Sequence, residues 1–132
     1  MSEQLVFDLP IKTAFGREDF YVSSSNTSAV KIIENWATWP LSKLILTGPS
    51  GSGKSHLASI WTEMTNGTRI DAKYLMEIDL QSISQSPLCL EGFELIAGDQ
   101  ELEAHAFHLH NLVQENGAPL LITGSSIPNT WN

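Results

Sequence analysis

The sequence predicts an α/β fold in which helices flank a parallel β-sheet. Short apolar runs alternate along the chain with segments of helical period, and a glycine-rich turn joins one such run to a helix. The length of 132 residues and the apolar share of 42% suit one domain with one hydrophobic core. We therefore expect an N-terminal arm over residues 1–24 and one α/β domain over residues 25–132.

The first half of the domain contains two predicted helices around one predicted strand. Asn26 can cap a helix that ends near Trp36. The apolar run at residues 43–47 (KLILT) is predicted as a buried strand, and a helix follows the glycine-rich turn over residues 54–64. The order strand, turn and helix is the start of a βαβ unit.

The second half continues the alternation of strands and helices. Residues 68–71 are predicted as a strand, and residues 72–83 are weakly helical. A third strand is expected at residues 87–90, a longer helix from Asp99 or Gln100 through Gln114, and a fourth strand at residues 118–123. Four strands separated by helices favour a parallel sheet.

Composition excludes several classes of protein. The formal net charge of −8 disfavours broad electrostatic binding to DNA or RNA, so we expect little direct DNA binding. The apolar runs are too short to cross a bilayer, and the N-terminus has no signal-peptide pattern. The single cysteine, Cys89, excludes a disulfide framework within the chain. These features predict a cytoplasmic protein that is not bound to a membrane.

Residues 48–55 (GPSGSGKS) match the P-loop pattern, with an apolar strand before them and an amphipathic helix after them. The glycines allow the backbone to approach phosphate oxygens closely, and Lys54 supplies charge for the β- and γ-phosphates. The Ser55 hydroxyl is a candidate Mg²⁺ ligand. We predict binding of ATP or ADP with Mg²⁺ through Gly48, Pro49, Ser50, Gly51, Ser52, Gly53, Lys54 and Ser55. A glycine–serine turn that matches by chance is the alternative.

The acidic motif expected in a P-loop ATPase is incomplete. Glu91 ends the third predicted strand and can help to hold the metal ion, which makes it the candidate catalytic carboxylate. Gly92 follows it and cannot act as a base. Glu94 and Asp99 are possible substitutes, although neither has the usual spacing from the strand end. We therefore predict nucleotide binding with slow hydrolysis or none.

Together these residues resemble the DnaA-related branch of the AAA+ ATPases, and within it the Hda-like regulators of replication initiation. The P-loop continues as Gly53-Lys54-Ser55-His56-Leu57, which resembles DnaA relatives. The stretch LEGFELIAGD at residues 90–99 is similar to the Hda form of the acidic motif. LLITGSSIP at residues 120–128 resembles the strand and turn that carry the first sensor.

The resemblance implies functions for further residues and for partners. His56 would contribute to the nucleotide site, Ser125 or Ser126 would lie near the γ-phosphate, and three upstream residues would lie beside the adenine: Phe20, Val22 and Asn26. The implied activity is regulation of replication initiation through the initiator DnaA and the sliding clamp.

Two departures from this family's pattern affect the prediction. Gly92 stands where DnaA has a second acid, and the sequence stops at Asn132, before the arginine finger, the fifth strand and the helical lid. The expected fold is therefore an AAA+ sheet truncated before the fifth strand and lid. An unpaired strand edge invites pairing with another chain, so homo-oligomers are expected.

The segment Gln4–Leu9 resembles the peptide by which Hda-like proteins attach to the sliding clamp. A glutamine and spaced apolar side chains on an extended arm suit a surface pocket, which makes Gln4, Leu5, Phe7 and Leu9 the candidate partner-binding residues. The alternative is an ordinary arm that folds these apolar side chains onto its own domain.

Other functions have weaker support in the sequence. His105, His108 and His110 lie on one predicted helix, but His110 projects elsewhere and no cysteine joins them, which disfavours a metal site. A small P-loop kinase would need a basic lid, and only Arg69 and Lys73 lie between the P-loop helix and the acidic motif. A nucleotide-free protein-binding scaffold is the third alternative.

Overall fold

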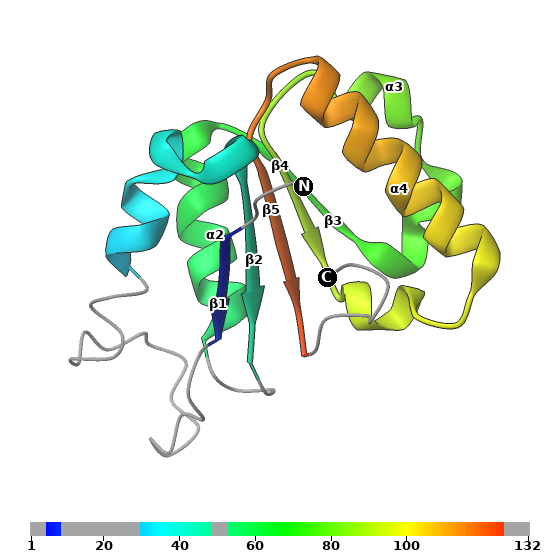
Figure 1. The fold of residues 1–132 in the computed structure, drawn as a ribbon, viewed down its shortest axis with the longest axis horizontal. Coiled ribbons are helices and arrows are strands. Elements are labelled where there is room, and N and C mark those ends of the chain that lie inside the picture. The colour runs from blue at the N-terminus through cyan, green and yellow to red at the C-terminus, as the bar shows by residue number, and fades with distance from the viewer. Residues whose placement is uncertain (1–4, 9–29, 49–52, 126–132) are drawn as a thin grey trace.

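A five-stranded parallel sheet forms the centre of the molecule (Figure 1). The computed structural model describes residues 5–8, 30–48 and 53–125. All neighbouring strands pair in parallel, in the order β1-β2-β5-β4-β3. The strands are β1 Leu5–Asp8, β2 Lys43–Thr47, β3 Thr68–Asp71, β4 Leu88–Glu91 and β5 Leu120–Gly124.

Helices cover both faces of this sheet, with α2 on one face and α4 with α3 on the other (Figure 1). Residues 30–34 are also helical. The α-helices are α2 Lys54–Thr65, α3 Leu80–Ile83 and α4 Gln100–Glu115. The 3-10 helices are η1 Trp36–Thr38, η2 Pro40–Ser42, η3 Ala72–Glu77 and η4 Phe93–Ile96.

Alternation along the strands divides the buried side chains between two cores. Successive side chains of a strand point to opposite faces, and the buried strands here are apolar on both. The core on the α2 side contains Leu44, Leu46, Leu57, Cys89 and Trp61, with Trp39 stacked on Trp61 at 5.6 Å between ring centroids. The core on the α4 side contains Ile45, Leu90, Phe93, Leu109 and Ile122.

Most of the predicted elements are confirmed. The strand at residues 43–47, the helix that begins at Lys54 and the strand at residues 68–71 lie where the pattern predicts them. The strand expected at residues 87–90 is displaced by one residue, and the strand expected at residues 118–123 is β5. Cys89 is buried, as its apolar neighbours indicate, and burial raises the pKa of its thiol.

The described residues of the predicted N-terminal arm belong to the sheet, which the sequence did not predict. Leu5–Asp8 form β1, which pairs in parallel with the outer flank of β2, Leu5 opposite Leu44 and Asp8 opposite Thr47. The sheet therefore has five strands and not the four expected. A four-residue segment carries too little periodicity to predict a strand, and its partner lies 35 residues or more further along the chain.

The helix expected from Asn26 to Trp36 is shorter at its C-terminal end than predicted. Residues 30–34 are helical, and Trp36 belongs to η1. Asn26 lies outside the described residues. Among the described residues, the structure contains no helix long and apolar enough to span a bilayer.

Candidate functional site

The predicted phosphate-binding residues lie at the carboxyl end of the sheet, between β2 and α2. Gly48 follows β2, and its N–H donates to the Gly124 carbonyl at the end of β5 over 3.3 Å. Gly53 precedes α2 with φ of +102°, a left-handed conformation that side chains disfavour. The first turn of α2 therefore faces this edge with its N-terminal N–H groups, as anion binding requires. The remaining loop residues, Pro49, Ser50, Gly51 and Ser52, lie outside the described residues.

The Lys54 side chain folds back toward Gly48, at the end of β2. Its Nζ donates to the Gly48 carbonyl, and the side chain is half-buried. Burial lowers the pKa of Lys54, because desolvation disfavours the charged form, and the nearby Glu94 carboxylate opposes this effect. A charged amine next to Gly48 is the group that the P-loop pattern requires for the β- and γ-phosphates.

Ser55 and Glu91 lie next to each other, as the P-loop pattern and the strand end predict. Ser55 Oγ, in the first turn of α2, donates to Glu91 Oε1 at the end of β4 over 3.4 Å. A hydroxyl and a carboxylate side by side are oxygen ligands of the type that Mg²⁺ takes. The fold therefore brings together two residues that are 36 positions apart in the sequence.

Arg69 lies beside Ser55 and Glu91, a position that the sequence reasoning did not predict. Its Nε donates to Glu91 Oε2 at 2.5 Å, and its Nη2 donates to the Ser55 carbonyl over 3.4 Å. The hydrogen bond and the charge of Glu91 raise the pKa of Arg69. Because Arg69 is opposite Cys89 in the β3–β4 register, its side chain leaves the sheet on the face that carries Glu91. The alternation of β3 was the signal that could have found it.

The Arg69 contact conflicts with the predicted metal ion. Glu91 presents one oxygen to the Ser55 hydroxyl and the other to a guanidinium, so both carboxylate oxygens have protein partners. A metal ion bound to Glu91 would lie against a fixed positive charge. The donor types suit Mg²⁺, but the site with Arg69 in this position does not fit it.

Glu94 reaches the site by a route that its spacing did not suggest. The η4 turn folds back, so that Glu94 Oε1 accepts a hydrogen bond from the Ser125 N–H over 3.0 Å. The same carboxylate acts on the charge of Lys54. The turn packs tightly, because a Cβ atom at Gly124 would come within 2.6 Å of the Phe93 ring and 2.8 Å of Glu94 Oε1. The structure therefore brings Glu94 near the site despite its spacing, and its function as a substitute acid stays a prediction.

The other predicted residues are brought to the site unevenly. His56 is exposed in the first turn of α2, and Ser125 is exposed directly after β5. Leu5 and Phe7 lie in β1, at the edge of the sheet. The remaining predicted residues lie outside the described part of the chain: Gln4, Leu9, Phe20, Val22, Asn26 and Ser126.

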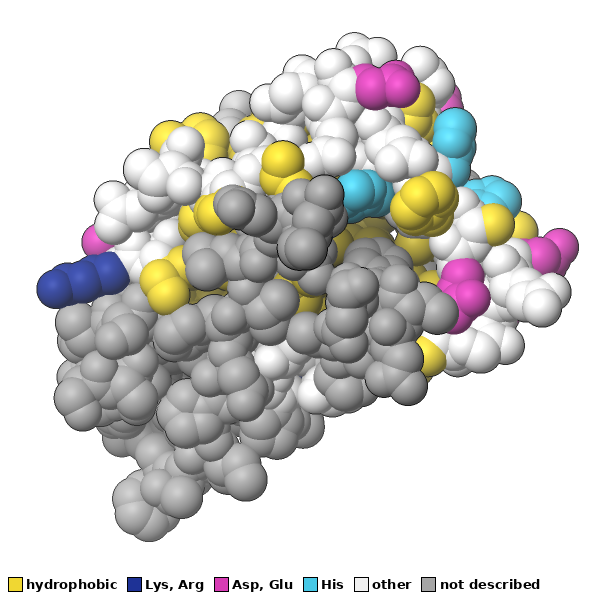
Figure 2. Space-filling view, viewed as in Figure 1, with side chains coloured by type: hydrophobic (Ala, Val, Ile, Leu, Met, Phe, Trp, Pro, Cys, Tyr) yellow, Lys and Arg dark blue, Asp and Glu magenta, His cyan; other side chains and the backbone are white. Residues whose placement is uncertain are grey.

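Among the histidines of α4, His110 has partners within the fold. Figure 2 shows histidine side chains beside hydrophobic ones over the α4 side of the molecule. The His110 ring stacks on Phe107 at 6.3 Å between centroids, and its Nε2 pairs with Lys43. Across the described residues, no three acidic, histidine or cysteine side chains are grouped to hold a metal ion. Asp99 caps α4 by accepting from the Leu102 N–H over 3.1 Å.

Curated relatives of this chain are replication initiators. The chromosomal replication initiator protein DnaA of Francisella tularensis subsp. novicida (strain U112) is 25% identical over 150 aligned positions, which cover 96% of this chain. The DnaA of Francisella tularensis subsp. tularensis (strain WY96-3418) has the same identity and coverage. The chain spans about 30% of the length of these relatives. No protein-family model matches the chain.

Solved structures of replication initiators share the fold. A DNA replication initiation factor superposes with a TM-score of 0.64 at 17% identity, over 88% of this chain and 43% of that one. The replication initiator DnaA bound to AMPPCP and single-stranded DNA gives 0.63 at 19% identity, over 83% and 41%. AMPPCP-bound DnaA from Aquifex aeolicus gives 0.61 at 18% identity, over 81% and 40%.

The fold and the comparisons define the class of this domain. It has an α/β fold with a parallel sheet between flanking helices, and this fold is structurally similar to part of DnaA. In sequence the chain is similar to DnaA at a low level of identity.

Proposed function

We propose that this chain is a nucleotide-binding module that acts in the initiation of DNA replication. The observation that carries the proposal is the contact of the half-buried Lys54 with the Gly48 carbonyl, which supports a phosphate-binding position for this lysine. The likeness to DnaA, and the AMPPCP bound by two of the solved DnaA structures, support ATP or ADP as the ligand.

The chemistry around Lys54 favours binding over turnover. Gly92, at the position after the strand-end carboxylate, has no side chain to orient water, and its φ of +75° suits glycine. Both carboxylate oxygens of Glu91 have protein partners, Ser55 and Arg69, so this side chain is not positioned to activate a water molecule. Hydrolysis by this site is therefore proposed to be slow or absent. Mg²⁺ at Ser55 and Glu91 stays a prediction.

The resemblance to Hda-like regulators extends the proposal to two partners, DnaA and the sliding clamp. The backbone of Leu5–Asp8 pairs with β2. Clamp binding through Gln4–Leu9 therefore requires these residues to leave the sheet edge. A four-residue edge strand has few hydrogen bonds to lose, so this exchange is compatible with the fold.

A titration of the chain with ADP and with ATP tests the proposal by calorimetry. Lys54→Met keeps an apolar stem and removes the charge, and we expect the affinity to fall about 10- to 100-fold, the effect of losing a charged hydrogen bond. Lys73→Met is the matched control: Lys73 is exposed on η3, with its Nζ 5.1 Å from the centroid of the Tyr74 ring, and the affinity should not change.

The alternatives predict other results in the same experiment. Absence of binding by the intact chain would contradict the proposal and favour the protein-binding scaffold. Transfer of the γ-phosphate to a small molecule would indicate the kinase. The kinase has less support, because Arg69, one of the two basic residues available for a lid, is held against Glu91.

A further inference from the structure

Arg69 connects three elements at the carboxyl end of the sheet. It leaves β3, reaches across the end of β4 to Glu91 Oε2 at 2.5 Å, and contacts the Ser55 carbonyl in the first turn of α2 over 3.4 Å. The Arg69 side chain is 35% exposed and that of Glu91 is 20% exposed, so water screens the pair only in part. These contacts fix the guanidinium beside the two residues expected to bind a metal ion.

A guanidinium in this position has two properties in common with a divalent cation. It carries a positive charge at every pH at which the protein is folded, and it neutralises the carboxylate at the end of β4. Its planar fork also donates in two directions at once, here to a carboxylate and to a backbone carbonyl. A metal ion bound to Glu91 would lie next to this guanidinium, and the repulsion between the two positive charges would weaken its binding.

We propose that the phosphate-binding site of this chain works without a bound magnesium ion, because the Arg69 guanidinium holds the position on Glu91 that the metal would take. The positive charges near the bound phosphates then come from Lys54 and Arg69 and from the N-terminal N–H groups of α2. This inference rests on the proposed nucleotide binding, and it concerns the way in which the same site neutralises its ligand.

The test compares ADP binding by calorimetry in excess magnesium chloride and in excess EDTA. For the intact chain we expect the two dissociation constants to agree within about threefold, which corresponds to about 0.7 kcal/mol. For Arg69→Gln, which frees the Glu91 carboxylate, we expect magnesium to tighten binding by about tenfold or more. Lys73→Gln removes a nearby exposed charge that has no contact with Glu91 in this structure, and it should behave like the intact chain.

A second variant separates the two functions of Glu91. In Arg69→Gln combined with Glu91→Gln, the guanidinium and the carboxylate are both removed. The response to magnesium that appears in Arg69→Gln should then disappear, because no carboxylate is left to bind the ion. Circular dichroism and the urea midpoint of each variant establish that it is folded.

The outcomes are distinguishable. Binding of ADP by the intact chain that weakens tenfold or more in EDTA would overturn this inference and leave the proposed function standing. Lack of binding in both buffers would overturn the proposed function itself. The comparison on the intact chain needs no substitution, so it decides the inference even if Arg69→Gln does not fold.

Discussion

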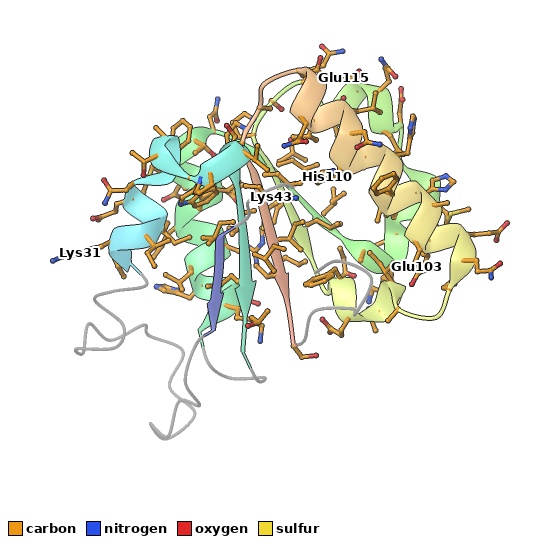
Figure 3. All side chains as sticks on the ribbon, viewed as in Figure 1. Lys31, Lys43, Glu103, His110 and Glu115 are labelled. Atoms are coloured by element: carbon orange, nitrogen blue, oxygen red, sulfur yellow. The ribbon has the colours of Figure 1, made fainter. Side chains whose placement is uncertain are left out.

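The carboxyl and amino ends of the sheet each hold a lysine with reduced access to water, and the two lysines have different neighbours. At the carboxyl end, Lys54 is half-buried, contacts the Gly48 carbonyl and lies near the Glu94 carboxylate. At the amino end, Lys43 is 5% exposed, and its Nζ lies 2.6 Å from His110 Nε2 (Figure 3).

The partner of Lys43 is a neutral side chain. Burial and the charge of Lys43 lower the pKa of His110, and burial lowers the pKa of Lys43. Neutral His110 can then accept from the lysine at Nε2, while its Nδ1–H faces Asn111 Oδ1 at 3.4 Å. This lysine is satisfied inside the fold. Lys54 instead lies beside Gly48, at the N-terminus of α2 and near the Glu94 carboxylate, and these neighbours support the proposed ligand site.

The largest effect on stability is expected from Gly124→Ala at the carboxyl end. The new Cβ would come within 2.6 Å of the Phe93 ring, and because this ring is fully buried, its displacement would disturb the core packing. We expect a loss of about 1–3 kcal/mol in the free energy of unfolding, measured with urea. Ser125→Ala, at the next residue, is the control and should change it by less than about 0.5 kcal/mol. Equal midpoints for Gly124→Ala and the intact chain would mean that the η4 turn is not packed as described.

A smaller effect is expected at the amino end when the pH is lowered. Because the pKa of His110 is lower in the folded chain, the unfolded chain takes up the proton first as the pH falls below about 6.5. The stability contributed by neutral His110 is therefore present at neutral pH and is lost as the pH falls toward the folded pKa.

The pH effect is measured by urea unfolding between about pH 7 and pH 5. His110→Gln keeps an acceptor for Lys43 and cannot titrate, so its stability should fall less over this range. His108→Gln, an exposed position on the same helix, should keep the full dependence of the intact chain. If His110→Gln and the intact chain respond identically, His110 is not the group responsible.

The smallest effect is expected from Lys43→Met. The substitution keeps the buried stem and removes the charge, and the partner left behind is neutral, so no unpaired buried charge results. We expect the free energy of unfolding to change by less than about 1 kcal/mol and nucleotide binding to stay the same. The pKa of His110, followed by NMR, should rise because a nearby positive charge is gone. A loss of nucleotide binding in this variant would remove the distinction between the two lysines.

The local parts of the site were predictable from the sequence. The pattern at residues 48–55 between an apolar strand and an amphipathic helix predicted the position of Lys54 and Ser55, because each glycine requirement is local. Glu91 was predicted at a strand end because it follows a short apolar run. The contact between Ser55 and Glu91 depends on β4 lying near α2 in the fold, and the structure shows this contact.

The contacts that the sequence did not predict join residues far apart in the chain. Arg69 and Glu91 are 22 positions apart, Glu94 and Ser125 are 31, and Lys43 and His110 are 67. Each depends on which strands are neighbours and on which face a side chain leaves. A one-residue change of register would move Arg69 to the opposite face and away from Glu91.

By itself, the sequence determined the class of fold and the positions of most strands and helices, because periodicity is a property of short segments. Only the tertiary structure decided that Leu5–Asp8 join the sheet beside β2, that a guanidinium engages the carboxylate at the end of β4, and that Glu94 turns back toward Lys54. The physical reason is that strand order and register set these distances, and neither is encoded in any one segment of the chain.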